Sequence, residues 1–120
     1  MLYYHNPRCS KSRKGLEYLE SKGIQEGVGF RVKEYLKDGV EEKEFLDLIK
    51  YTGLAPLDGL IRTKEALFKD LGLAGKELSD MEWAKLVHEN PKLLERPILV
   101  NDDKKAAIGR PDAHSFDPII

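Results

Sequence analysis

The sequence predicts an α/β protein in which helices pack on a small mixed sheet, and three features of the pattern predict it. A short apolar stretch, a helical pattern and a second apolar stretch open the chain, in the order of a βαβ unit. Helical periodicity dominates the middle, and two apolar stretches separated by a turn close the chain as a hairpin. At 120 residues, the chain is expected to form a single domain over residues 1–120.

The opening unit follows from turn and cap signals. Residues 1–5 are apolar and aromatic and run into an Asn-Pro turn, which predicts a short strand. In residues 10–22, leucines three positions apart stand among charged side chains, which predicts a helix. Gly23 provides the left-handed residue that ends it. In residues 28–33 apolar and polar side chains alternate, as in a half-buried strand.

The middle of the chain is expected to be helical. Residues 41–52 carry apolar side chains on one face, and shorter helical pieces are expected at 57–62 and 64–71. The sequence Ser-Asp-Met-Glu at 79–82 is a capping box, and it opens a helix that must stop near the Asn-Pro pair at 90–91.

The chain returns to strand at its end. Residues 97–101 and 104–109, split by two aspartates, predict an antiparallel hairpin, and the tail at 111–120 has no clear period. The order βαβ, helices, ββ resembles a thioredoxin-like fold, a mixed sheet with a helical insertion.

Composition excludes several classes of protein. Twenty basic and 21 acidic side chains leave a net charge of −1 without a polybasic run, so neither nucleic acid nor an anionic membrane is an expected partner. The apolar strip at residues 98–100 has the length of a strand, not of a membrane span. Residues 1–5 lack the features of a signal peptide, so a cytoplasmic protein is expected.

The single cysteine, Cys9, is either a buried small hydrophobic residue or a free reactive thiol. It lies between the first predicted strand and the first predicted helix, where free backbone N–H groups and the helix dipole stabilise an anion. The first sixteen residues contain four Arg or Lys residues and no acidic side chain, which favours a thiolate. The same setting suits an oxyanion beside the sulfur, and Arg13, about one helical turn along, could hold it bidentately.

Other polar residues near Cys9 admit two interpretations. His5 could stabilise a thiolate or be a satisfied polar residue at a strand end. Ser12 could donate to the sulfur or satisfy a helix-terminal N–H group. The remaining histidines have no partner at ligand spacing, so no metal site and no bound cofactor are expected.

Three arginines lie at the ends of predicted elements, where a site can gather groups from distant parts of the chain. Arg62 ends a helical piece, Arg96 precedes a strand, and Arg110 ends the last strand. Each taken alone is more typical of a surface ion-pair residue. The Arg96-Pro97 bond also permits a cis peptide.

Together these residues resemble the ArsC/Spx-like branch of thioredoxin-fold proteins, in particular glutaredoxin-linked arsenate reductases. The resemblance covers nearly the whole chain. It rests on Tyr4-His5-Asn6-Pro7, Cys9-Ser10-Lys11-Ser12-Arg13, Leu60-Ile61-Arg62 with Glu65, Arg96-Pro97-Ile98 and Gly109-Arg110-Pro111.

The resemblance implies an enzyme in which Cys9 attacks arsenate or a related oxyanion. Arg62, Arg96 and Arg110 would bind the oxyanion and stabilise the thiolate, with His5 and Ser12 in support. Glutathione would then attack the adduct as a co-substrate, and glutaredoxin would resolve the mixed disulfide. A lone cysteine fits this scheme because the resolving thiol must come from outside the chain.

Alternatives remain within and beyond this family. A thiol switch with a C-x-x-C pair is excluded by Ser12, and the Cys-x5-Arg pattern of thioredoxin-linked arsenate reductases and small tyrosine phosphatases would need arginine where Gly15 stands. A glutathione-linked thiol oxidoreductase and a non-catalytic protein-binding adaptor of the same fold both stay open.

Overall fold

The computed structural model describes residues 1–120, and it has four short strands, five α-helices and three 3-10 helices. The strands are β1 (Leu2–Tyr4), β2 (Arg31–Lys33), β3 (Ile98–Val100) and β4 (Ala106–Ile108). The α-helices are α1 (Ser10–Ser21), α2 (Tyr35–Asp38), α3 (Glu42–Thr52), α4 (Ala66–Asp70) and α5 (Asp80–Glu89). The 3-10 helices are η1 (Pro56–Asp58), η2 (Pro91–Leu93) and η3 (Ala113–Ile119).

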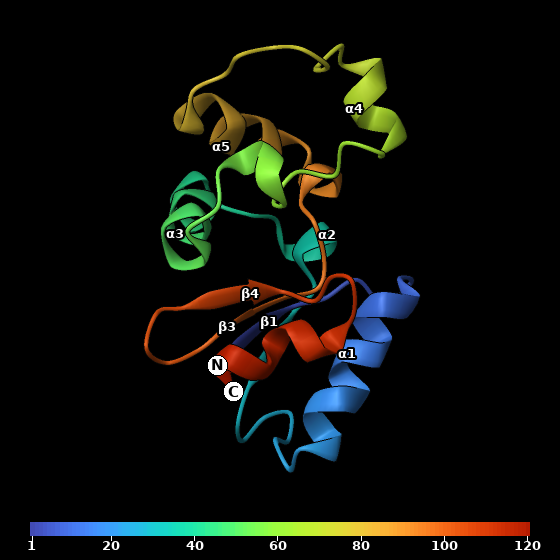
Figure 1. Ribbon diagram of the computed structural model, residues 1–120. Coiled ribbons are helices and arrows are strands. Elements are labelled where there is room, and N and C mark those ends of the chain that lie inside the picture. The colour runs from blue at the N-terminus through green and yellow to red at the C-terminus, as the bar shows by residue number, and fades with distance from the viewer. The chain divides into compact units, whose positions relative to one another are not determined.

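These elements divide into two compact units (Figure 1). The first unit comprises Met1–Asp38 and Arg96–Ile120 and contains the whole sheet. The second unit, Gly39–Glu95, is helical and corresponds to the expected insertion.

The sheet has the strand order β2-β1-β3-β4. Strand β1 runs parallel to β2, with Tyr4 opposite Lys33, and antiparallel to β3, with Tyr4 opposite Ile98. Strands β3 and β4 form the expected hairpin, with Ile98 opposite Ile108. The carboxyl ends of β1, β2 and β4 therefore lie at the same end of the sheet as the start of β3.

One face of the sheet is covered by α1 and η3 (Figure 1). Their side chains form a core with the strands, made of Tyr3, Leu19, Phe30, Leu99 and Phe116. Burial of large apolar side chains is the dominant stabilising contribution in a unit of this size. Tyr4 and Ile98, which point to the opposite face, are buried as well.

The second unit is built around the helix pair α3 and α5, which present Phe45 and Trp83 to its interior. Phe68 of α4 stacks on Trp83, with ring centroids 6.4 Å apart. Helix α5 begins at the expected capping box, because the Ser79 hydroxyl accepts the backbone N–H of Glu82 and the Glu82 carboxylate accepts that of Ser79.

The strand expected at residues 28–33 begins only at Arg31. Gly27 has a positive φ of 83°, and the backbone N–H groups of Val28 and Gly29 both donate to the Gln25 carbonyl, so this segment is a turn. Val28 is consequently 88% exposed. The predicted strand is therefore confirmed for residues 31–33 and wrong for residues 28–30.

Further differences concern short elements. The helical piece expected at 57–62 is the single turn η1, and the one at 64–71 shortens to α4. Helix α2 and the C-terminal η3 form where no element was expected. In η3, burial of Phe116 in the core of the first unit supplies the stabilisation that local sequence does not show.

Candidate active site

Cys9 is the N-cap residue of α1 and is half-buried. The preceding turn is set by Asn6, whose side-chain oxygen accepts the backbone N–H of Arg8 and whose carbonyl accepts that of Cys9, at 3.0 Å in each case. The extended backbone of Cys9 (φ −92°, ψ 121°) then leads directly into the helix. The Asn-Pro signal thus places the cysteine at the positive end of α1.

The sulfur of Cys9 lies in surroundings that favour the thiolate. Burial raises the pKa of the thiol, because it disfavours the charged form. Hydrogen bonds from the backbone N–H of Ser12, from the side chain of Arg96 and from the backbone N–H of Lys11, together with the charge of Arg96, lower it. The lowering contributions win, so the pKa of Cys9 falls below its ordinary value.

Arg96 and Arg110 reach Cys9 because of the register of the hairpin. Arg96 precedes β3 and Arg110 follows β4, and the pairing of these strands puts both residues at the end of the sheet where β1 delivers Cys9. The Arg110 Nε donates to the Arg96 carbonyl at 3.0 Å, and Arg110 Nη2 lies 3.9 Å from the Cys9 Sγ. Both arginines are followed by cis prolines, as the sequence permitted for Arg96.

Arg62 belongs to the second unit and is held there by carboxylates. Its Nη1 lies 3.0 Å from Glu65 and its Nε 3.5 Å from Glu95, and its side chain is 22% exposed. Its backbone N–H donates to the Leu93 carbonyl at 2.8 Å. The structure therefore brings Arg96 and Arg110 to Cys9. That Arg62 acts at the same site stays a prediction.

Arg13 is exposed, and its guanidinium donates to the Pro7 carbonyl at 2.8 Å. This bond ties the first turn of α1 to the turn before Cys9. Arg13 therefore has a defined structural contact, while its proposed role in holding an oxyanion stays a prediction.

His5 and Ser12 form a buried network beneath the turn. His5 is 7% exposed and Ser12 is fully buried, and the His5 Nδ1 lies 2.7 Å from the Ser12 Oγ. The backbone N–H of Asn6 donates to the same hydroxyl oxygen at 3.0 Å. A neutral ring satisfies all three groups, because the hydroxyl then accepts from Asn6 and donates to Nδ1.

The charge state of His5 follows from its surroundings. Burial is the largest influence and lowers the pKa of His5. The charges of Glu34 and Glu26 raise this pKa, and the charge of Arg13 lowers it. The net result is a pKa below the ordinary value, so the neutral ring prevails at pH 7. No hydrogen bond joins His5 to the Cys9 sulfur, and the ring instead orients Ser12 in the first turn of α1.

Two residues that sequence reasoning did not select also shape this turn. The hydroxyl of the fully buried Tyr3 donates to the Ser12 carbonyl at 2.6 Å. A Cβ at Gly15 would come 2.1 Å from that hydroxyl oxygen, so only glycine fits there. A glycine inside a helix was the one sequence signal of this close contact, and the contact explains why position 15 cannot hold the arginine of a Cys-x5-Arg loop.

No group of three or more His, Cys, Asp or Glu side chains is placed to hold a metal ion. None of the helices combines the length and the apolar character that a membrane crossing requires.

Comparison with known proteins gives a consistent result. The ArsC family model matches residues 4–115. The chain is 41% identical over 111 residues to an arsenate reductase of Haemophilus influenzae, covering 92% of this chain and 91% of that protein. An arsenate reductase of Neisseria meningitidis serogroup A is 41% identical over 108 residues, 90% of this chain and 88% of its own length.

A solved structure extends the similarity to three dimensions. The arsenate reductase from Vibrio cholerae superposes with a TM-score of 0.85 at 38% identity, covering 97% of this chain and 94% of that one. The expected thioredoxin-like fold with a mixed sheet and a helical insertion is thereby confirmed. The chain belongs to the ArsC family.

Proposed function

We propose that this protein is an arsenate reductase in which Cys9 is the nucleophile and glutathione and glutaredoxin supply the electrons. The observation that carries the proposal is the convergence of Arg96 and Arg110 on the sulfur of Cys9 at the start of α1. A polarised thiol beside two guanidinium groups suits a nucleophile that must attack an anion. The names of the similar proteins support arsenate as the substrate.

The first step forms a covalent adduct. The Cys9 thiolate attacks arsenic, a sulfur–arsenic bond forms, and one arsenic–oxygen bond breaks as the leaving oxygen takes up protons and departs as water. The arginines offset the negative charge of the arsenate oxygens. The hydrogen bonds from the helix N–H groups to the sulfur weaken as its negative charge moves to the adduct. Arsenic remains in its pentavalent state at this stage.

The second step moves the electrons. A glutathione thiolate attacks the sulfur of Cys9, a disulfide bond forms, and the sulfur–arsenic bond breaks with its electron pair on arsenic. Arsenic leaves as trivalent arsenite, and the two sulfurs are oxidised to the mixed disulfide. A glutaredoxin thiolate then attacks the glutathione sulfur, which releases Cys9 as the thiolate. The chain has one cysteine, so it depends on outside thiols for this step.

The cytoplasm is the compartment that this chemistry favours. Its thiol pool keeps a lone cysteine reduced and regenerates glutathione, whereas an oxidising compartment would trap Cys9 as a mixed disulfide.

The decisive experiment is NADPH oxidation coupled through glutathione reductase, glutaredoxin and glutathione, with and without arsenate. We expect arsenate-dependent turnover that Cys9→Ser abolishes, and Arg110→Ala should raise the arsenate concentration required. Turnover of a glutathione mixed disulfide without any response to arsenate would instead identify a thiol oxidoreductase. No turnover with either substrate would overturn the enzyme proposal in favour of a binding adaptor.

A further inference from the structure

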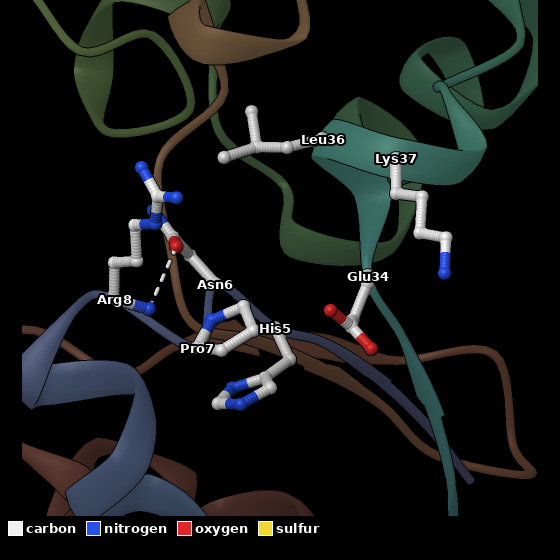
Figure 2. Close-up of a pocket in the computed structure, with 7 residues that line it drawn as sticks. All are labelled: His5, Asn6, Pro7, Arg8, Glu34, Leu36 and Lys37. Carbon is white, nitrogen blue, oxygen red and sulfur yellow. Dashed lines mark hydrogen bonds between the residues drawn. The ribbon is translucent and has the colours of Figure 1, made fainter.

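The turn that carries Cys9 has different surroundings on its two sides, because β1 lies between β2 and β3. On the side of β3, the guanidinium group of Arg110 approaches the sulfur. On the side of β2 lies a pocket of about 330 Å³, lined by residues 5–8 and by Glu34, Leu36 and Lys37 (Figure 2). The approach of Arg110 depends on a turn that the sheet alone does not hold.

The strand pairing ends before it reaches Arg110. Strand β4 stops at Ile108, and the N–H of Gly109 donates to the Pro97 carbonyl at 2.8 Å. The N–H of Arg110 donates instead to the carbonyl of Ile108 in its own strand, also at 2.8 Å. Arg110 thus begins a turn outside the ladder, so the conformation of this turn depends on contacts from other elements.

A serine of η3 holds the backbone of this turn. The Ser115 hydroxyl donates to the Arg110 carbonyl at 2.7 Å, in partly buried surroundings. The start of η3 is fixed by Asp112, whose carboxylate accepts the N–H of His114 at 2.9 Å. Phe116, which follows Ser115, is fully buried in the core of the first unit. Both neighbours of Ser115 are therefore fixed, which keeps its hydroxyl within reach of the Arg110 carbonyl.

A lysine of α1 holds the same turn from a second element. Lys11 lies in the first turn of α1, and its Nζ donates to the Pro111 carbonyl at 2.8 Å. The backbone N–H of Lys11 is also one of the groups that lower the pKa of Cys9. The consecutive carbonyls of Arg110 and Pro111 are therefore bound by η3 and by the helix that Cys9 caps.

The held backbone decides where the Arg110 side chain can reach. Its Nε donates to the Arg96 carbonyl at 3.0 Å, and its Nη2 lies 3.9 Å from the Cys9 Sγ. A long side chain loses several rotatable bonds when it is ordered, so it keeps one geometry only where its backbone is fixed as well. Loss of the Ser115 bond would let the guanidinium group move away from the sulfur.

We propose that Ser115, assisted by Lys11, is a positioning residue that directs the guanidinium group of Arg110 to the Cys9 sulfur and to the oxyanion beside it. The oxyanion is that of the proposed function, on which this part of the inference rests. A serine that only stabilised η3 would change the free energy of unfolding and leave the reactivity of Cys9 as it is. A positioning serine changes the ionisation of the thiol and the affinity for the oxyanion.

The first test measures the thiol without any substrate. The rate of Cys9 alkylation by iodoacetamide is followed against pH in the wild type, Ser115→Ala and Ser21→Ala. The midpoint should move to higher pH in Ser115→Ala, because a donor near the thiolate moves away. Ser21→Ala removes a hydroxyl bond to the Tyr18 carbonyl in the same unit, 2.6 Å long, and should leave the midpoint unchanged. An unchanged midpoint in Ser115→Ala would overturn the proposal.

Further variants separate positioning from stability. Ser115→Thr keeps the hydroxyl at a half-buried position, so it should keep the wild-type midpoint. Lys11→Gln should raise the midpoint more than Lys14→Gln, which makes the same charge change at an exposed position of α1. The lysine pair tests the turn even where Ser115→Ala proves unstable in urea unfolding. Equal changes in the two lysine variants would reduce the effect to charge and contradict the role of Lys11.

A double-mutant cycle shows whether Ser115 acts through Arg110. In the Arg110→Ala background, Ser115→Ala should not move the midpoint further, because the group that it positions is absent. In the coupled NADPH assay, Ser115→Ala should raise the KM for arsenate about 2- to 5-fold, as expected when one charge contact weakens, and change kcat less. Additive effects of the two substitutions would show that Ser115 acts independently of Arg110 and would overturn the proposal.

This proposal and the proposed function fail separately. A wild type that does not turn over arsenate would refute the proposed function, while the alkylation midpoints would still decide whether Ser115 positions Arg110. Arsenate turnover with the same KM and the same midpoint in Ser115→Ala would uphold the proposed function and refute the role of Ser115.

Discussion

Gly15→Ala tests the packing beneath helix α1, because two physical effects predict opposite signs for the change in stability. Gly15 lies in the interior of α1, where alanine normally stabilises a helix by about 1 kcal/mol relative to glycine. In this structure the added Cβ would lie 2.1 Å from the Tyr3 hydroxyl oxygen and 3.2 Å from its ring carbon. Tyr3 is fully buried and cannot move aside freely.

The expected loss follows from what must move. Displacing the Tyr3 ring overpacks the core, which costs about 1–3 kcal/mol, and breaks its hydrogen bond to Ser12, worth about 1 kcal/mol. Subtracting the helix gain of about 1 kcal/mol leaves a net destabilisation of about 1–3 kcal/mol. The same movement disturbs the first turn of α1, so the pKa of Cys9 should rise.

Urea unfolding of four proteins provides the measurement. Wild type, Gly15→Ala, Tyr3→Phe and the double variant form a double-mutant cycle, in which removing the hydroxyl should relieve part of the Gly15→Ala loss. We expect the two single losses to exceed the loss in the double variant by about 1 kcal/mol or more. A Gly15→Ala chain as stable as wild type, or more stable, would refute the close contact.

Three other outcomes follow from the geometry. Arg96→Gln should raise the pKa of Cys9, measured from the pH dependence of alkylation, while Arg31→Gln at an exposed position should leave it unchanged. The same Cys9 pKa in both variants would contradict the Arg96 contact. Cys9→Ser should make the free energy of unfolding less dependent on pH. In wild type, ionisation of the Cys9 thiol stabilises the fold fully above the unfolded pKa of about 8.5. This stabilisation is lost as the pH falls through the lower pKa of the folded state. Parallel curves for the two proteins would exclude a lowered pKa. Ser79→Ala should cost about 1 kcal/mol in urea unfolding, because it removes the acceptor of the Glu82 N–H, and no loss would mean that the cap is dispensable.

Local signals predicted those parts of the fold that are stabilised locally. The capping box at Ser79 and the left-handed Gly23 mark helix ends in the sequence and in the structure, because each acts within one turn of backbone. The turn around Val28 was misread because Gly27 adopts a positive φ, and alternation alone does not reveal that break. Helix η3 was missed because its stability depends on Phe116 reaching a core formed by distant segments.

The candidate site likewise has features that depend on local sequence and features that depend on distant segments. The position of Cys9 at the start of a helix was predictable, since it depends on a neighbouring Asn-Pro turn. The convergence of Arg96 and Arg110 on Cys9 needs the register of three strands, which spacing cannot provide, and the resemblance to a family supplied it instead. The pocket at Glu34 was not foreseen, because it depends on the parallel pairing of β1 with β2.

One feature of the sheet accounts for both the surroundings of Cys9 and the neighbouring pocket. Strand β1 is central, so its carboxyl end has β2 on one side and β3 on the other. The antiparallel neighbour brings Arg96 and Arg110 to Cys9, where they stabilise negative charge. The parallel neighbour ends beside the same turn and opens a pocket with both signs of charge. A mixed sheet thus gives the end of one strand two different surroundings, one basic and one with both signs of charge.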